Sequence, residues 1–259
     1  MRAWSLVRQQ PHYRHEAFLS GLRVAGYSVT AGAPSFPLSR GDVLVTWNRY
    51  GEHERIADRF EREGGTVLVA ENGYIHGRHD GGDYYALSIH GHNGIGRWNV
   101  GGAERWERLG VELQPFRSEG KHVLIAPNRS FGMRGYTMPN NWPQDAAERM
   151  RRVTLLPVRV RLHPGNDAPK VPLENDLRDA HCVVIWSSSV GVKALIAGIP
   201  VVCEAPAWIC KSATTSDYAG IDQDWSARRL EALRRLAWAQ WKVEEIANGT
   251  AFRSLLKIA

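Results

Sequence analysis

Three consecutive serines stand where residue types and spacing point most directly to chemistry. Ser187, Ser188 and Ser189 follow an apolar segment, 182–186, and precede a run of small residues, 192–197. The pattern predicts a strand, a turn and a helix, and the backbone N–H groups and macrodipole at a helix N-terminus favour an anion. An ordinary helix cap needs one serine rather than three. We therefore interpret the stretch as a phosphate-binding turn.

A histidine–proline pair lies upstream of this turn. Proline favours extended backbone at His163, at the end of the predicted strand 158–162, where the imidazole can donate to a phosphate and stabilise a leaving group. Alone, the pair is more often structural; its position one strand–helix unit before the serines favours the catalytic interpretation. Lys193 is equally compatible with binding a phosphate and with a solvated helix position. The further candidates for binding the same donor are Arg161, Pro164, Asn128, Arg129 and Lys193.

A carboxylate marks a strand end in the first half of the chain. Glu71 follows the apolar segment 66–70 and precedes Asn72-Gly73, a turn signal. A carboxylate in this position can deprotonate an acceptor hydroxyl, although many such acids only cap turns. Glu71 is therefore the predicted general base.

Polar and aromatic residues near other predicted strand ends form an acceptor side. They are Asn48, Arg49, His92, Asn93 and Trp98. Amide and guanidinium groups bind hydroxyls or phosphates, and an exposed indole can stack on a sugar or a base. The spacing of His90 and His92 suits a metal, but the sequence order provides no evident third ligand. No metal site is predicted.

Apolar strands alternating with helices must position these residues. The predicted strands are 3–7, 43–47, 66–70, 84–89, 122–126, 158–162, 182–186 and 201–203. The alternation predicts an α/β fold with parallel sheets covered on both faces, whose ligands bind beyond the carboxyl ends of the strands. A polar break after residue 117 separates an acceptor-side domain, 1–117, from a donor nucleotide-binding domain, 118–259. We expect two Rossmann-like domains facing across a cleft, closed by a C-terminal helical region, 226–246.

Composition narrows the class of protein further. The 259 residues carry a net charge of +6, which suits a polyanionic partner and a merely arginine-rich surface equally. The chain also contains ten tryptophans. Three cysteines in apolar surroundings predict small core residues rather than disulfides, and a reducing cytoplasm fits them. The chain shows neither a signal-peptide pattern nor an apolar run long enough to span a bilayer. Signatures of P-loop kinases, serine hydrolases and NAD enzymes are also absent.

Taken together, the motifs resemble capsule-type Kdo and polysialic acid transferases and related phage-encoded glycosyltransferases. The matching segments are Glu71-Asn72-Gly73, His163-Pro164, Ser187–Leu195 and the region 236–241. The resemblance implies a GT-B fold in which Glu71 is the base, while His163, Ser187 and Ser188 hold the donor phosphate. Asn72 stands where the family has a second acid. Lys193 stands where a glutamate often contacts the nucleotide, which favours a UDP-sugar over a CMP-sugar.

The short chain and its basic pI lead to a specific hypothesis. We expect a metal-independent, phage-type glycosyltransferase that moves a sugar from a nucleotide-sugar co-substrate to 5-hydroxymethylcytosine, or another 5-hydroxymethylpyrimidine, in DNA, with no resident cofactor. One alternative is a capsular or lipopolysaccharide glycan acceptor with a CMP-linked Kdo or sialic acid donor. Another is a non-catalytic module that binds a nucleotide or polyanion. The sugar and the oligomeric state stay open.

Overall fold

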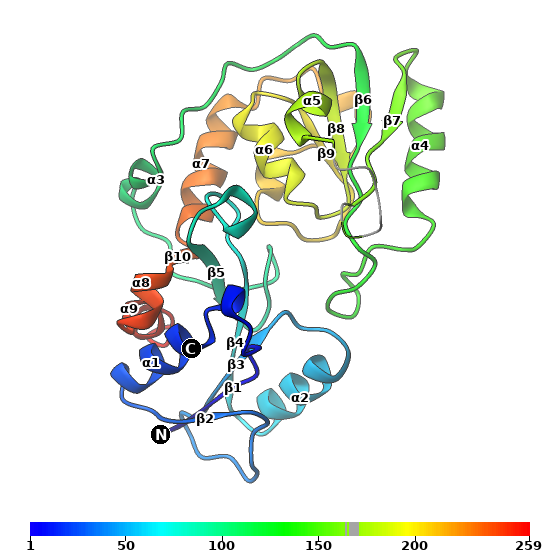
Figure 1. The fold of residues 1–259 in the computed structure, drawn as a ribbon. Coiled ribbons are helices and arrows are strands. Elements are labelled where there is room, and N and C mark those ends of the chain that lie inside the picture. Colours follow the sequence, from blue (N-terminus) through cyan, green and yellow to red (C-terminus); the bar gives the residue numbers. More distant parts are fainter. Residues whose placement is uncertain (164, 166–170) are drawn as a thin grey trace. The chain divides into compact units, whose positions relative to one another are not determined.

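The chain folds into two compact units, each built on its own sheet (Figure 1). The computed structural model describes residues 1–163, 165 and 171–259. The first unit comprises Met1–Leu109, Gly132–Arg134 and Arg235–Ala259, and the second comprises Gly110–Phe131 and Gly135–Arg234. Each unit is described by itself below, and the predicted cleft between them stays a prediction.

The first unit contains a six-stranded sheet in the order β10-β5-β4-β3-β1-β2. Its strands are β1 (Arg2–Ser5), β2 (Ser28–Ala31), β3 (Val43–Trp47), β4 (Thr66–Asn72), β5 (Tyr84–Ile89) and β10 (Gln240–Lys242). Strands β1 to β4 are mutually parallel, whereas β5 is antiparallel to β4 and β10 is antiparallel to β5.

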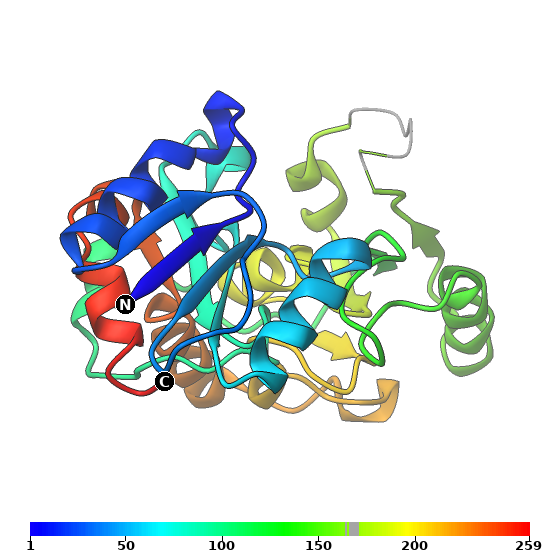
Figure 2. The same ribbon diagram turned by 90° about the horizontal axis from the view of Figure 1, so that it is seen from below.

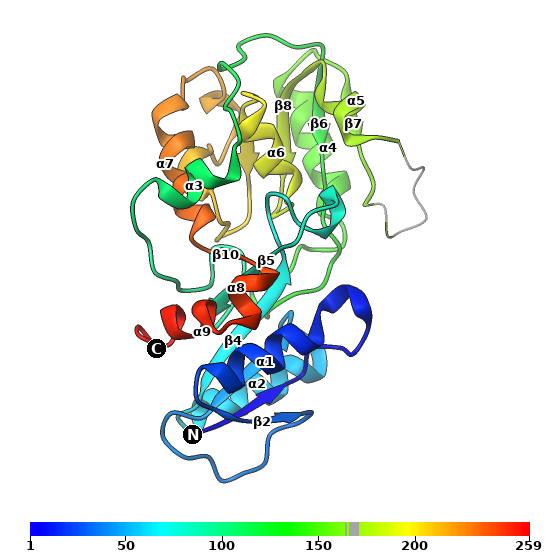
Figure 3. The ribbon, with the colours of Figure 1, turned by 60° about the vertical axis from the view of Figure 1, so that its left-hand side comes forward.

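Helices cover both faces of this sheet. The helices of the unit are α1 (His15–Val24), α2 (Gly51–Arg62), α3 (Glu104–Leu109), α8 (Val243–Ala247) and α9 (Thr250–Leu255), with short 3-10 turns η1 (Pro11–Tyr13) and η2 (Arg78–Asp80). Ala57 and Phe60 of α2 pack on Trp4 and Leu44 on one face. On α1, Phe18 makes edge contacts with Tyr85 and Phe252, so α1 and α9 lie together (Figure 3).

The second unit contains a four-stranded, fully parallel sheet in the order β7-β6-β8-β9. Its strands are β6 (His122–Ile125), β7 (Val158–Val160), β8 (Ala180–Ile185) and β9 (Val201–Cys203). Its helices are α4 (Trp142–Val153), α5 (Leu173–Leu177), α6 (Val190–Ile196) and α7 (Ser226–Ala237), with 3-10 turns η3 (Lys211–Ala213) and η4 (Tyr218–Gly220). One core packs α4 on β6 and β8.

The cysteines behave as the sequence predicts. Cys182, Cys203 and Cys210 are free and buried, and burial raises the pKa of each thiol, to about 12 for Cys182 and about 11 for Cys203. Protonated thiols at neutral pH act as small apolar side chains. Among the described residues, the structure contains no helix with both the length and the apolar character needed to cross a membrane.

The structure corrects the predicted sheet and the predicted C-terminal helix. The first sheet is mixed rather than parallel, because β5 and β10 reverse direction. The region 226–246 is not one helix: α7 ends at Ala237, and Gln240–Lys242 pairs with β5. The buried Gln240 side chain holds this segment in place, because it accepts hydrogen bonds from the N–H groups of Tyr74 and Ile75. Residues 235–259 consequently belong to the first unit, and the units divide after Leu109 rather than at residue 117.

Candidate functional site

Polar residues gather at the carboxyl edge of the second sheet. Because all four strands are parallel, their carboxyl ends share this edge. The segments that leave it begin with Asn128 and Arg129 after β6, His163 after β7, Ser187 after β8 and Glu204 after β9. Most of the predicted donor-binding residues therefore lie along one sheet edge.

His163 and Arg129 form a pair at this edge. The Gly165 N–H donates to His163 Nδ1 over 3.0 Å. The proton of a neutral imidazole is therefore assigned to Nε2, where it can be donated to an anion. A Cβ atom built on Gly165 would stand 3.2 Å from His163 Nδ1 and 3.6 Å from Arg129 Nη1, so both side chains lie next to this glycine. The pair can stabilise negative charge on a phosphate.

The three serines occupy different environments. Ser188 is buried, and its Oγ accepts a hydrogen bond of 3.4 Å from the N–H of Val190, so this side chain stabilises the turn. Ser189 is exposed at the N-cap of α6 and makes no side-chain capping bond. The N–H of half-buried Ser187 donates to Asn128 Oδ1 over 3.3 Å, which ties the turn to the segment after β6. Of the three serines, Ser189 is thus exposed, Ser187 half-buried and Ser188 buried.

Arg161 is placed differently from the prediction, whereas Lys193 lies on the predicted helix. Arg161 forms an ion pair with Asp176 of α5 and donates to the Val171 carbonyl over 2.5 Å, so it anchors the segment after β7. Lys193 lies half-buried in the first turns of α6. Pro164 lies outside the described residues.

Glu71 lies at the carboxyl edge of the first sheet, among other polar groups. It is half-buried near the end of β4, in register with Ala86 of β5. The N–H of Asn48, a residue with a positive φ of 59°, donates to the Ala70 carbonyl over 2.9 Å. Asn72 follows Glu71. Its Oδ1 atom is buried and has no hydrogen-bond partner among the described residues. Buried polar atoms without a partner are uncommon in folded proteins, which sets this strand end apart.

The segment after β5 reaches the same edge through Tyr74. The N–H of Asn93 donates to Tyr74 Oη over 3.0 Å, which brings the predicted residue Asn93 to the turn that begins at Glu71. His92 is its neighbour, and burial lowers the pKa of this imidazole to about 4, so the ring is neutral at pH 7. The Nδ1 atom of His92 is buried without a partner among the residues that the structure describes. Glu71, Asn72, Tyr74 and Asn93 thus form one candidate acceptor site.

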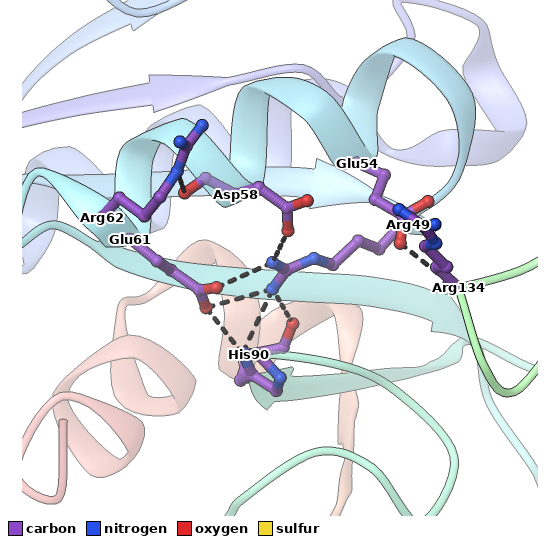
Figure 4. Close-up of polar contacts among 7 residues, drawn as sticks. All are labelled: Arg49, Glu54, Asp58, Glu61, Arg62, His90 and Arg134. Carbon is purple, nitrogen blue, oxygen red and sulfur yellow. Dashed lines mark hydrogen bonds and ion pairs between the residues drawn. The ribbon is translucent and has the colours of Figure 1, made fainter.

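Arg49 is a structural residue in this unit, which corrects its predicted role in binding an acceptor. Its side chain is only 1% exposed. Figure 4 shows its guanidinium between α2 and His90. It donates to Asp58 over 2.6 Å, to Glu61 over 2.7 Å and to the His90 carbonyl. Burial lowers the pKa of Arg49, but the hydrogen bonds to Glu61 and Asp58 outweigh burial and raise the pKa above its ordinary value.

Trp98 is also unavailable to stack on a ligand. The indole is 8% exposed, and its Nε1 donates to the Arg235 carbonyl over 3.1 Å. The guanidinium of Arg235 covers the ring at 5.3 Å from its centroid. The ring therefore fixes the start of the C-terminal segment within the first unit.

Some residues at the two edges escaped the sequence reasoning. In the first unit they are Tyr74 and His79, whose Nε2 lies 3.4 Å from Asn72 Nδ2. In the second unit, Glu204 accepts from Trp142 Nε1 over 2.7 Å and from Arg149 over 2.5 Å. Glu204 follows β9 directly, so applying the strand-end rule to every strand would have identified it.

Comparison with known proteins identifies the fold. No family model matches the chain, and no curated protein matches it either. Among solved structures, the KpsC beta Kdo 2,7 transferase of Thermosulfurimonas dismutans matches with a TM-score of 0.55 and 14% identity, over 98% of this chain and 99% of that chain. The KpsC beta Kdo 2,4 transferase of the same organism matches with a TM-score of 0.59 and 12% identity, over 93% and 92%.

These two likenesses show the fold and support one part of the resemblance. The chain has an α/β, GT-B-like fold, as the motifs imply. Both solved structures carry the name of a Kdo transferase, and the link to phage DNA-modifying enzymes is not shown. The glycan alternative therefore fits the comparisons better than the DNA acceptor.

Proposed function

We propose that this protein is a glycosyltransferase that moves a sugar from a nucleotide-sugar donor to a hydroxyl of a capsular or lipopolysaccharide glycan. The observation that carries the proposal is the likeness to two Kdo transferases, one of which is covered over 99% of its length. We propose a glycan acceptor in place of the 5-hydroxymethylpyrimidine of DNA, because no finding supports the DNA acceptor.

In this proposal the second unit binds the donor. A departing nucleotide carries negative charge on its phosphate, and hydrogen-bond donors fixed in advance stabilise such charge. We assign two such groups to His163 and Arg129, and two more to the hydroxyls of half-buried Ser187 and exposed Ser189. Asn128 orients the serine turn by accepting from the N–H of Ser187.

The first unit supplies the base. The carboxylate of Glu71 takes the proton of the acceptor hydroxyl while the oxygen of that hydroxyl attacks the anomeric carbon of the donor sugar. The new glycosidic C–O bond forms while the bond from the anomeric carbon to the donor phosphate breaks, and the nucleotide leaves with that electron pair. Asn72, the next residue, is half-buried at the end of β4, and we expect its side-chain amide to bind a second hydroxyl of the acceptor.

The donor we propose to test first is CMP-linked Kdo, since both named structures are Kdo transferases. Lys193 instead of a glutamate favours a UDP-sugar, so UDP-sugars form the competing set. A CMP-sugar releases a monophosphate and a UDP-sugar releases a diphosphate. A larger anion needs more donors, and in this proposal Lys193 of α6 adds one.

The deciding experiment incubates the protein with CMP-Kdo, CMP-sialic acid or UDP-sugars, each with a glycan acceptor or with duplex DNA that contains 5-hydroxymethylcytosine. Products are identified by mass spectrometry. We expect a sugar mass increment on the glycan, its loss in Glu71→Gln, and its retention in the control Glu16→Gln, an exposed glutamate on α1.

Two other results would redirect the assignment. An increment on DNA alone would restore the nucleic-acid acceptor. Donor binding without transfer or hydrolysis of any sugar nucleotide would indicate a non-catalytic nucleotide-binding module.

A further inference from the structure

The α4–β7 region of the second unit has an unusual charge pattern. Between residues 149 and 163 the chain contains no aspartate or glutamate and five arginines: Arg149, Arg151, Arg152, Arg159 and Arg161. Two of these are held by carboxylates within the unit, Arg149 by Glu204 and Arg161 by Asp176. The other three are exposed.

Large apolar side chains are exposed within the same segment. Leu155 has a relative exposure of 105%, Val153 of 55%, Leu162 of 53% and Val160 of 40%. Single exposed apolar residues are normal on a protein surface, but a group of four within ten residues marks an interaction surface. Their neighbours are not equally exposed: Val158 packs against the core of the unit.

These side chains share one border of the second sheet. β7 is the edge strand next to β6, and α4 runs beside it (Figures 1 and 2). Val153 ends α4, Leu155 lies in the connection, and Val160 ends β7. We call the exposed side chains of Arg151–Val153, Leu155, Arg159, Val160 and Leu162 the α4–β7 surface.

We propose that the α4–β7 surface binds a membrane rich in anionic phospholipid. Arginines attract the phosphates of anionic lipids, and exposed apolar side chains enter the boundary between headgroups and acyl chains. The acidic residue nearest to the arginines among the described contacts is Glu148. It lies 4.0 Å from Arg152, and both side chains are exposed, so this ion pair neutralises little.

Other occupants fit this surface less well. A soluble polyanion would pair with the arginines but leave Leu155 in water. A second copy of the chain would cover Leu155, but a symmetric contact would bring a second set of arginines to the same patch, where Glu148 is the acidic residue among the described contacts. A lipid surface is the occupant that satisfies both the charge and the apolar side chains.

Binding has a consequence for the site. Leu162 directly precedes His163, so contact at this surface brings the candidate donor site close to the lipid headgroups. This arrangement suits an acceptor glycan anchored in the membrane. That consequence depends on the proposed function, whereas the membrane binding does not.

The test is flotation with vesicles of phosphatidylcholine alone or equimolar phosphatidylcholine and phosphatidylglycerol. We expect the protein to bind only the anionic vesicles and to dissociate at high salt. Arg151→Gln/Arg152→Gln/Arg159→Gln should weaken binding on the order of 100-fold, at about fivefold per arginine. Val153→Ser/Leu155→Ser keeps the charges and should weaken binding about tenfold.

The matched control is Arg23→Gln/Val24→Ser at the end of α1, where an exposed arginine precedes a valine of 56% exposure. It should bind as the wild type does. Three results would overturn the proposal: no binding to anionic vesicles, equal losses in the control, or a dimer that both surface variants dissociate. Vesicle binding needs no sugar donor, so its failure is distinguishable from failure of the proposed transferase activity.

Discussion

The two sheets receive similar polar residues at the carboxyl ends of their strands, yet they use them differently. In the second unit, all four strands are parallel, and His163, Arg129 and Ser187 remain at the edge. In the first unit, Arg49 leaves the edge and becomes the most enclosed charge of a network with Asp58, Glu61 and His90. Glu71 and Asn72 stay at the edge beside it.

The difference shows that a strand-end position alone does not assign a role. A guanidinium can be buried when two carboxylates lie within reach on a helix packed against its own sheet. Paired and hydrogen-bonded charges tolerate burial. Arg129 has no such carboxylate among its described contacts and lies exposed over Phe131. The position of acidic residues on the covering helix therefore separates the structural arginine from the candidate ligand-binding one.

The largest expected effect separates the chemistry of the two units. Glu71→Gln should lower kcat about 1000-fold without changing donor affinity, since it removes the base and leaves the second unit intact. His163→Ala should weaken donor binding as well as transfer. Transfer assays measure kcat, and calorimetric titration measures donor affinity, so together they distinguish the Glu71→Gln variant from the His163→Ala variant. Equal loss of donor affinity in both variants would contradict the division of roles.

The buried network gives the largest expected effect on stability. Glu61→Gln leaves the enclosed Arg49 with Asp58, whose side chain is 53% exposed, and should destabilise the first unit by about 3 kcal/mol. Adding Arg49→Met should recover part of the loss, because the unpaired charge disappears. Hydrogen exchange of α2 and β5 measures the change. A double variant less stable than Glu61→Gln would show that the arginine stabilises by other contacts.

The pH dependence of stability tests the neutral histidine of the first unit. The folded pKa of His92 is about 4, against 6.5 as the ordinary value, so between these values only the unfolded chain binds the proton. Stability should therefore fall as the pH falls from about 6.5, by about 2 kcal/mol at pH 5. Urea unfolding at several pH values measures this slope. His92→Gln should flatten it, and an unchanged slope would assign the effect to other groups.

The smallest expected effect separates the serines of the second unit. Ser188→Ala removes the acceptor for the Val190 N–H and should cost about 1 kcal/mol of stability while leaving donor affinity nearly unchanged. Ser187→Ala should leave stability nearly unchanged and weaken donor binding by about fivefold. Thermal unfolding and donor titration form the matched pair of measurements. Identical behaviour of the two variants would remove the distinction between turn and ligand.

Much of the site was predictable because strand ends are local features of a sequence. The apolar runs that form β3, β4, β6, β8 and β9 lie close to their predicted bounds, and most of the polar residues that follow them, though not Arg49, lie at the sheet edges. The antiparallel direction of β5 was not predictable, because its apolar pattern is the same for either direction. Tyr74 was missed because its Oη meets Asn93 only after β5 has turned the chain back.

The sequence by itself determined the α/β class, the core cysteines and the order of the candidate motifs, since these follow from local composition and hydrophobic periodicity. Tertiary structure alone decided which polar residues are enclosed. Arg49 meets Glu61 twelve positions away, and Gln240 meets Ile75 across 165 positions to bring the C-terminal segment into the first sheet. Burial depends on such distant partners, and a pattern read along the chain does not contain them.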